Sequence, residues 1–358
     1  MKKRLYIFSD TVMKRKDNTI LLETVANREE EEMPEEILQN REEFLLGEDI
    51  ITSSGEKKYL PVEGIDSIFS AGIIRFNSKF LYFLSLHKIP LHVLNYNGKY
   101  AGSFIPAGGT SSAVTLLKQA AVFNDPDDRL YLAQQFVYGA AVNQIINLRY
   151  YNNRGVVLSG YIEQIEQFTG LIKDTTSVEE LMGFEGAIKR AYYSAWQNIF
   201  IYPTGFTHRV KRPPDNMINS LISYGNMIVY GVCLNEIYQT RIYPEISFLH
   251  EPTEGRLSLH LDLAELFKPL LTDRIIFKVI NKNIIGEKDF IYRNGYCYIK
   301  KNARRLFAQE FEKKLTTKIL IREKDKSISY RGMIRQECYK LAKHINKEEN
   351  YESFKAKW

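Results

Sequence analysis

Three segments of the sequence place acidic or imidazole side chains in otherwise apolar surroundings. Glu185 lies in LMGFEG, His250 follows SFL, and Asp262 and Glu265 lie three residues apart in LHLDLAELF. A hard divalent ion prefers oxygen ligands, and Mn²⁺ also tolerates one imidazole among carboxylates. Glu185, His250 and Glu265 could therefore hold Mg²⁺ or Mn²⁺ and leave positions open for water and phosphate. Such an ion can polarise a phosphoryl oxygen and activate an attacking hydroxyl in a phosphodiester displacement.

Each of these residues also has a purely structural interpretation. Glu185 and Lys189 have the i, i+4 spacing of a surface ion pair on a helix. His250, which the pattern places in a helix-to-strand connection after Pro244, is a lone histidine of a kind that is more often structural than a ligand. Asp262 and Glu265, at the start of a helix that follows the strand-like alternation of RLSLHLDL, could face one point or merely complement the helix N-terminus. A zinc hydrolase is disfavoured because HExxH and paired Cys or His spacings are missing from the sequence.

Length and composition indicate an ordinary globular protein of two domains. The 358 residues exceed what one hydrophobic core usually spans. The chain is 44% hydrophobic and 26% charged, and neither a membrane span nor a secretory signal is expected, which predicts a cytoplasmic protein. The three cysteines are too few and too widely spaced for a disulfide framework.

Charge is distributed unevenly along the chain. Residues 28–49 hold ten acidic side chains against two arginines, and they are predicted to form an acidic insertion that is a spacer or an arm for a basic partner. Residues 300–358 hold 17 Lys or Arg against eight Asp or Glu, with aromatic residues between them. A polyanion is therefore a plausible partner, although a solvated helical surface explains the basic tail equally well.

The hydrophobic pattern changes near residue 100, from strand-like to helical. Four segments read as strands, RLYIFSD, NTILLETV, KKYLPVEGIDSIFSAG and IPLHVLNYNGKYAGSF, and SKFLYFLSLHK among them reads as a helix. After Pro106, Gly108 and Gly109, nearly every segment has helical spacing, with a break at residues 124–127. The predicted organisation is a β-rich domain at 1–100, a linker at 101–112, a helical domain at 113–345 and a basic tail at 346–358.

Four segments resemble the signature segments of the family of CRISPR-associated protein one, the metal-dependent integrase of spacer acquisition. They are FEG at 184–186, PPDNMINSLISYGNMIVYG at 213–231, FLHE at 248–251 and LDLAELFKPLLTDR at 261–274. The amino-terminal strand segments are also similar to that family, so the resemblance covers nearly the whole chain. It implies an α+β protein with an N-terminal β-sandwich-like domain, which forms a homodimer, and an all-helical C-terminal catalytic domain.

The resemblance also assigns site residues. The family's metal ligands fall on Glu185, His250 and Glu265, where Glu265 replaces the Asp of some members, and Asp262 is an acidic neighbour that could orient water or a second ion. Tyr230 matches an aromatic position near the active site. The candidates for contacts to the DNA backbone are Arg75, Arg209, Lys211 and Arg212.

The leading interpretation is a DNA integrase that uses Mg²⁺ or Mn²⁺. In it, the 3′-hydroxyl of a short double-stranded DNA attacks a phosphodiester in a CRISPR repeat array, and two homodimers are bridged by CRISPR-associated protein two. One alternative is a metal-dependent nuclease of branched or single-stranded DNA, because the same ligands could activate water instead of a hydroxyl. The other is a non-catalytic nucleic-acid-binding scaffold, which would bind in a salt-dependent manner without needing metal.

Overall fold

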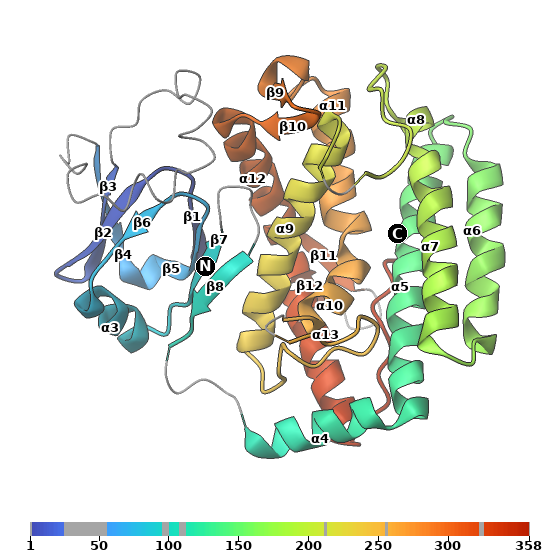
Figure 1. Cartoon of the computed structure of the whole chain (residues 1–358), viewed down its shortest axis with the longest axis horizontal. Helices are drawn as coiled ribbons and strands as arrows, with labels where there is room; N and C mark the ends of the chain where they lie inside the picture. The colour runs from blue at the N-terminus through green and yellow to red at the C-terminus, as the bar shows by residue number, and fades with distance from the viewer. Residues whose placement is uncertain are drawn as a thin grey trace. The chain divides into compact units, whose positions relative to one another are not determined.

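The computed structural model describes residues 2–24, 56–94, 100–106, 112–210, 213–254, 257–321 and 326–357. The chain divides into two compact units, Met1–Gly109 and Thr110–Trp358 (Figure 1). The predicted acidic insertion at 28–49 lies outside the described residues.

Within its described residues, the first unit contains two four-stranded sheets and one α-helix. In one sheet the order is β1-β5-β7-β8, and β1 and β7 both run parallel to β5; its strands are β1 (Lys3–Ile7), β5 (Ile65–Ser70), β7 (Leu91–Leu94) and β8 (Tyr100–Phe104). In the other sheet the order is β4-β3-β2-β6; its strands are β4 (Lys57–Pro61), β3 (Thr19–Thr24), β2 (Thr11–Lys16) and β6 (Ile74–Arg75).

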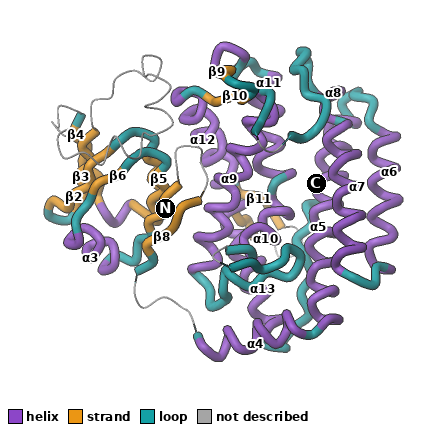
Figure 2. The backbone as a smooth tube through the Cα atoms, in the orientation of Figure 1, coloured by secondary structure: helices purple, strands orange, loops and turns teal. Residues whose placement is uncertain are grey.

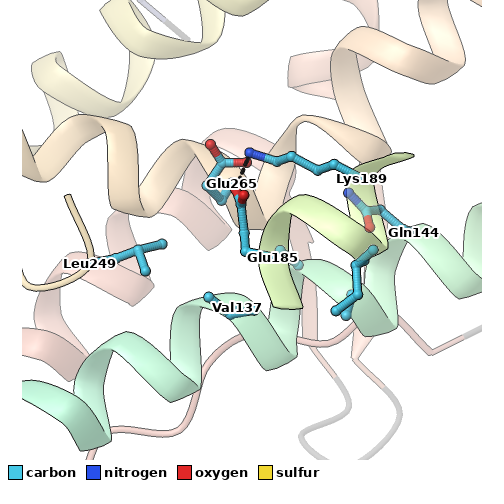
Figure 3. Close-up of a pocket in the computed structure, with 9 residues that line it drawn as sticks. Val137, Gln144, Glu185, Lys189, Leu249 and Glu265 are labelled. Carbon is cyan, nitrogen blue, oxygen red and sulfur yellow. Dashed lines mark ion pairs between the residues drawn. The ribbon is translucent and has the colours of Figure 1, made fainter. Parts of the chain in front are cut away.

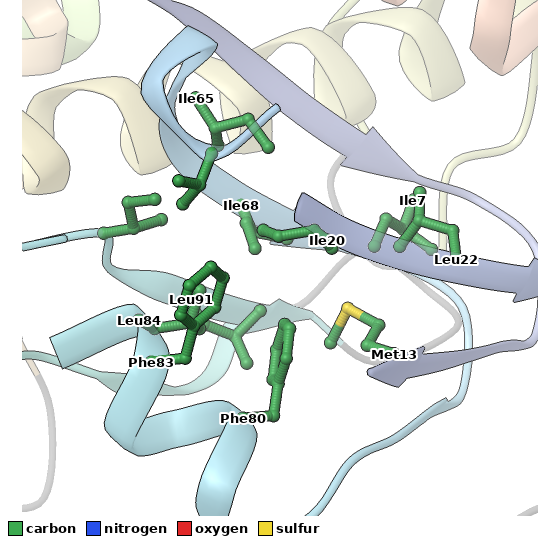
Figure 4. Close-up of a cluster of buried hydrophobic side chains, with 12 residues drawn as sticks. Ile7, Met13, Ile20, Leu22, Ile65, Ile68, Phe80, Phe83, Leu84 and Leu91 are labelled. Carbon is green, nitrogen blue, oxygen red and sulfur yellow. The ribbon is translucent and has the colours of Figure 1, made fainter. Parts of the chain in front are cut away.

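One apolar core joins these sheets to helix α3 (Ser78–Leu86). Ile68 from the first sheet, Ile20 and Met13 from the second, and Phe80 and Phe83 from α3 are almost fully buried in the same cluster (Figure 4). Burial of these side chains is the main favourable term for this unit. The predicted N-terminal β-sandwich-like domain is therefore confirmed.

The second unit is dominated by helices, which Figure 2 distinguishes from its few strands. Helices α5, α6 and α7 lie side by side, and α10 packs against both α5 and α9 (Figure 1). The helices are α4 (Ala113–Asn124), α5 (Pro126–Asn152), α6 (Ser159–Leu171), α7 (Val178–Ser194), α8 (Trp196–Ile199), α9 (Met217–Tyr238), α10 (Leu259–Phe267), α11 (Arg274–Asn281), α12 (Lys301–Thr316) and α13 (Tyr330–Ile345), with a π-helical turn at Pro269–Asp273.

Local signals explain where the helices begin. The predicted break at residues 124–127 is present, because the Asp125 side chain accepts hydrogen bonds from the backbone N–H groups of Asp127 and Asp128, and Pro126 occupies the first turn of α5. Ser177 caps α7 and Asn216 caps α9 in the same way. These caps fix the starts of two helices that carry candidate site residues.

Two details of the second unit differ from the helical pattern. Short hairpins join some of the helices, formed by β9 (Phe290–Arg293) with β10 (Tyr296–Ile299) and by β11 (Lys318–Ile321) with β12 (Lys326–Ser329). The strand-like alternation expected before Asp262 is also wrong, since α10 begins at Leu259. All nine residues of α10 are buried. Apolar residues therefore occur on every side of the helix, and their spacing does not indicate a strand.

Helix α9 is the one helix among the described residues that is long and apolar enough to cross a membrane, with a mean hydropathy of 1.3. It is 78% buried within the protein, as expected for a core helix.

Asn143 connects α5 to α10 and to the C-terminal segment. Its Nδ2 donates to the carbonyl oxygens of Leu266 at 2.8 Å and Phe354 at 3.2 Å, and its Oδ1 accepts from the Ala356 N–H at 2.8 Å. Asn143 is fully buried, so its side-chain amide cannot turn to water instead. The bonds hold α10 in register beside α5.

Asn143→Leu should lower the free energy of unfolding by about 2–4 kcal/mol, because it leaves buried backbone groups without partners. Urea unfolding of the two proteins measures the difference. Asn302→Leu, at an exposed position in the first turn of α12, is the control and should change stability by less than about 0.5 kcal/mol. Equal stability of Asn143→Leu and the wild type would show that these bonds do not hold α10.

Candidate active site

Helix α7 supplies the first carboxylate of the site. Buried Leu181 and Ile188 fix the face of α7 that packs into the unit. Glu185 lies on the same helix with its side chain only 13% exposed, and its carboxylate contacts the Lys189 ammonium one turn later. The predicted Glu185–Lys189 pair is thus present, but it lies in the interior and not on an open surface.

Helix α10 supplies the second carboxylate. The Glu265 side chain is 5% exposed, and its two oxygens contact different cations: Lys189 Nζ at 3.1 Å and Lys268 Nζ at 2.7 Å. Because Lys189 also contacts Glu185, the two carboxylates converge on one ammonium group (Figure 3). Residues 80 positions apart in the sequence therefore share a single cation position.

The electrostatics of this cluster favour charged side chains. Burial alone would raise the pKa of Glu265, but Lys189, Lys268 and His250 together hold this pKa well below its usual range. Burial would conversely lower the pKa values of Lys189 and Lys268, and the neighbouring carboxylates raise both above the ordinary lysine value. Glu265 is thus an ionised carboxylate in a buried setting, which requires cations beside it.

Asp262 fixes the position of His250. Asp262 is fully buried and accepts the backbone N–H groups of Phe248, Leu249 and His250 at 2.7, 3.0 and 3.1 Å. Its Oδ1 also lies 2.7 Å from Nδ1 of the His250 ring. A carboxylate on one ring nitrogen orients the other nitrogen toward a ligand, as is common around metal-binding histidines. The arrangement leaves Nε2 of His250 as the candidate ligand atom and makes Asp262 a positioning residue.

The donor set suits a divalent cation, provided that Lys189 moves. Two carboxylates already share one cation, and an oriented imidazole lies near enough to lower the pKa of Glu265. Within the described residues, however, no three His, Cys, Asp or Glu side chains form a ready metal-binding group. The adjoining cavity measures only about 10 Å³, room for about one water molecule. A metal ion would thus replace the Lys189 ammonium between Glu185 and Glu265.

Tyr230 lies close to this cluster. The Lys268 ammonium is 4.8 Å from the centroid of its ring, and Lys268 in turn contacts Glu265. His260 packs edge-on against the same ring at 5.5 Å. Sequence reasoning did not single out Lys268, although its i, i+3 spacing from Glu265 was a visible signal.

The candidate DNA-contacting residues are spread over the chain. Arg209 donates to the Val210 and Asn219 carbonyl oxygens and to the side chains of Asn219 and Ser223, so its guanidinium braces the start of α9. Arg75 ends β6 in the first unit. Lys211 and Arg212 lie outside the described residues.

A buried acid behind the site was not anticipated from the sequence. Tyr192 donates a hydrogen bond to Asp273 Oδ2 at 2.9 Å, and Asn147 Nδ2 donates to the Tyr192 hydroxyl at 2.7 Å. Burial raises the pKa of Asp273 to about 8, and the Tyr192 hydrogen bond and Lys268 offset only part of this rise. Asp273 is therefore largely protonated at neutral pH.

Comparison with known proteins places these residues in context. A family model described as CRISPR associated protein Cas1 matches residues 5–313. A relative from Fusobacterium nucleatum subsp. nucleatum, named CRISPR-associated endonuclease Cas1, is 40% identical over 358 residues, which span 100% of this chain and 98% of the relative.

Solved structures show the same fold. A CAS1 protein from Thermotoga maritima is 32% identical and superposes with a TM-score of 0.80, covering 99% of this chain and 100% of that one. A casposase bound to its integration product is 21% identical with a TM-score of 0.81, covering 98% of this chain and 93% of the casposase chain. The latter likeness is one of fold.

Lys189→Met should increase affinity for Mn²⁺ by at least about tenfold, since it removes the cation that competes for Glu185 and Glu265 while retaining most of the apolar stem. Isothermal titration calorimetry measures the dissociation constant. Lys173→Met, at an exposed position that follows α6, is the matched control. Unchanged affinity in Lys189→Met would show that metal does not bind where this ammonium lies.

The protonation of Asp273 predicts a dependence of stability on pH. Because its pKa in the folded protein is raised above the ordinary 3.8, its contribution is complete below pH 3.8 and is lost as the pH rises to about 8. Between pH 6 and 8 the free energy of unfolding should fall by up to about 1.4 kcal/mol per pH unit from this group.

Asp273→Asn should remove this part of the decline, which urea unfolding at pH 6 and pH 8 measures. Asp174→Asn, an exposed aspartate, should retain the wild-type slope. A slope in Asp273→Asn equal to that of the wild type would contradict the assignment of the titrating group.

Proposed function

The chain belongs to the family of CRISPR-associated Cas1 endonucleases, and we propose that it joins short double-stranded DNA to a CRISPR repeat array by metal-dependent transesterification. A 3′-hydroxyl of the short duplex attacks a phosphodiester of the repeat, and the 3′-oxygen of the cleaved strand leaves. The convergence of Glu185 and Glu265 on one cation, beside a histidine oriented by Asp262, is the observation that carries this proposal.

Glu185, Glu265 and Nε2 of His250 would hold Mg²⁺ or Mn²⁺. When bound, the ion supplies Lewis-acid polarisation of the phosphoryl oxygen and stabilises negative charge that develops on the attacking and leaving oxygens. Carboxylate oxygens suit both Mg²⁺ and Mn²⁺, and the imidazole of His250 favours Mn²⁺ over Mg²⁺.

The remaining residues position these groups. Asp262 holds the His250 ring through Nδ1 and fixes its loop through three backbone N–H groups. Lys268 remains beside Glu265 and keeps that carboxylate ionised. We propose that Tyr230, whose ring contacts Lys268, orients the phosphate or the attacking strand end.

Partners follow from the family and from the charge of the chain. We propose that double-stranded DNA is the substrate and that Arg75, Lys211 and Arg212 contact its backbone, whereas the bonds of Arg209 suit a structural role better. We further propose a homodimer through the N-terminal unit, bridged to a second by CRISPR-associated protein two, working in the cytoplasm. Co-elution of the two proteins at low salt tests this assembly.

Glu185→Gln should reduce strand joining at least about 100-fold, because it removes one charged ligand from the metal position while leaving side-chain volume unchanged. The assay combines a short duplex with free 3′-hydroxyl ends, a repeat-containing plasmid, the partner protein, and Mn²⁺, Mg²⁺ or EDTA. Glu179→Gln, an exposed glutamate in the first turn of α7, is the matched control and should retain activity.

The products separate the candidate functions. Metal-dependent joined DNA that is lost in Glu185→Gln supports the integrase. Cutting without joining would identify the nuclease instead. Binding that weakens with salt and is unaffected by EDTA, with neither product formed, would identify the scaffold.

A further inference from the structure

The hairpin of β9 and β10 carries three tyrosines that are turned to solvent. Tyr292, Tyr296 and Tyr298 are 49, 41 and 38% exposed. Asn294 and Gly295 form the turn between the strands, and both have positive φ, as a tight two-residue hairpin turn requires. Large aromatic side chains that are exposed together on one short element mark a binding surface, whereas single exposed ones need no explanation.

The pairing of the strands places two of these tyrosines on one face of the hairpin. Tyr296 lies opposite Arg293, and residues directly opposite each other point to the same side of an antiparallel pair. Tyr298 follows two residues later and shares that side. Phe290 and Cys297 point to the other side, where both are buried. The solvent-facing side with Arg293, Tyr296 and Tyr298 is called the tyrosine face below.

The two rings of the tyrosine face lie nearly parallel. Their centroids are 5.8 Å apart, and their planes differ by only 12°. A ring of this kind can stack with a nucleic-acid base whatever the identity of the base, because every base has a π-face. The rings of Tyr296 and Tyr298 therefore offer parallel stacking surfaces to unpaired bases.

The hairpin is fixed to the start of α9 (Figure 1). The Cys297 N–H donates to the Pro214 carbonyl oxygen at 2.9 Å, and Ser220 Oγ donates to the Cys297 carbonyl oxygen. Tyr230, beside the candidate active site, lies about 15 Å further along the axis of α9 than Ser220, at a rise of about 1.5 Å per residue. About four stacked nucleotides of one strand cover this distance at about 3.4 Å each.

Positive charge beside the tyrosine face favours a nucleic acid over a protein as its ligand. Arg293 lies on the face itself and is exposed. Lys288 precedes β9, and Lys300 and Lys301 follow β10 directly. Protein interfaces are depleted in lysine, whereas surfaces that bind single strands combine basic side chains with aromatic rings.

The acidic residues that precede the hairpin have other partners. Asp289 Oδ2 accepts the backbone N–H of Gly286 at 2.9 Å. Glu287 lies near Tyr292, because burial, followed by Cys297 and then Glu287, raises the pKa of Tyr292. Tyr292 points to the same side of the hairpin as Cys297, away from the tyrosine face.

We propose that the tyrosine face binds unpaired bases of a DNA strand by stacking, with Arg293 on an adjoining phosphate. This inference rests on the proposed function in one respect, that the nucleic acid is the DNA on which the protein acts. Stacking does not depend on base identity, so the face would bind a strand without reading its sequence. Bases within a duplex already stack on one another, so the face would select single-stranded over double-stranded segments.

Tyr296→Ala tests the proposal by equilibrium binding in EDTA, where metal-dependent joining cannot occur. The probes are a fluorescein-labelled single strand of about 20 nucleotides and the duplex of the same sequence, both followed by anisotropy. We expect affinity for the single strand to fall about five- to tenfold and affinity for the duplex to stay unchanged. Tyr296→Phe keeps the ring and should bind both probes as the wild type does.

The salt dependence separates stacking from charge. Tyr296→Ala removes no charge, so the slope of log K against log salt should equal that of the wild type. Arg293→Gln removes one phosphate contact, and the magnitude of the slope for the single strand should fall by about 0.7.

Tyr339→Ala, an exposed tyrosine of α13, is the matched control and should bind both probes normally. Thermal melting verifies that the variants are folded. Wild-type affinity of Tyr296→Ala for the single strand would overturn the proposal, as would an equal loss for the duplex or an equal loss in Tyr339→Ala. If Tyr296→Ala binds the single strand normally but no longer co-elutes with CRISPR-associated protein two, the face is a protein interface and the proposal is wrong.

The outcome is distinguishable from a failure of the proposed function. If joining persists in Glu185→Gln, the catalytic assignment is wrong, whereas metal-free binding by the tyrosine face still stands or falls on Tyr296. If joining is lost in Glu185→Gln but Tyr296→Ala binds the single strand normally, the catalytic assignment stands and the stacking site does not.

Discussion

The candidate site depends on one constraint, which is that Glu265 stays ionised although its side chain is almost fully buried. An isolated buried carboxylate would become neutral, because water no longer solvates its charge. Lys189 and Lys268 prevent this, each from within hydrogen-bonding or ion-pair distance. The packing of α7 against α5 and of α10 against α5 and α9 is what brings these groups together. The two carboxylates of the site are therefore positioned by the helical core.

A second buried carboxylate, that of Asp262, fixes the loop that carries His250. Residues 248–250 form no helix or strand, yet Asp262 accepts all three of their backbone N–H groups. A loop that would otherwise be free to move is thereby attached to α10, the helix that also carries Glu265. One buried helix thus sets the distance between the imidazole and the second carboxylate. Removal of the Asp262 carboxylate would release the His250 ring and leave the backbone N–H groups of residues 248–250 without this acceptor.

Much of the fold was predictable from local pattern, while the interactions in the site were not. The N-terminal strands, α3 and the break between α4 and α5 follow from β-propensity, helical spacing and the Asp125–Pro126 cap. Glu185, His250, Asp262 and Glu265 stood out as polar residues in apolar segments. The bridging position of Lys189 and the anchoring role of Asp262 were not visible, because both depend on which helices meet in three dimensions. The raised pKa of Asp273 and the bonds of Asn143 arise from burial that sequence spacing alone does not reveal.

The central claim is that Glu185 and Glu265 share one cation position, which is taken by Lys189 in the structure and by a divalent metal in the active protein. A crystal structure with Mn²⁺, using anomalous scattering at the manganese edge, tests it most directly. We expect one anomalous peak between the two carboxylates, within coordination distance of His250 Nε2, with the Lys189 ammonium displaced. A peak elsewhere, or an undisturbed Lys189 between the two carboxylates at saturating metal, would contradict the account.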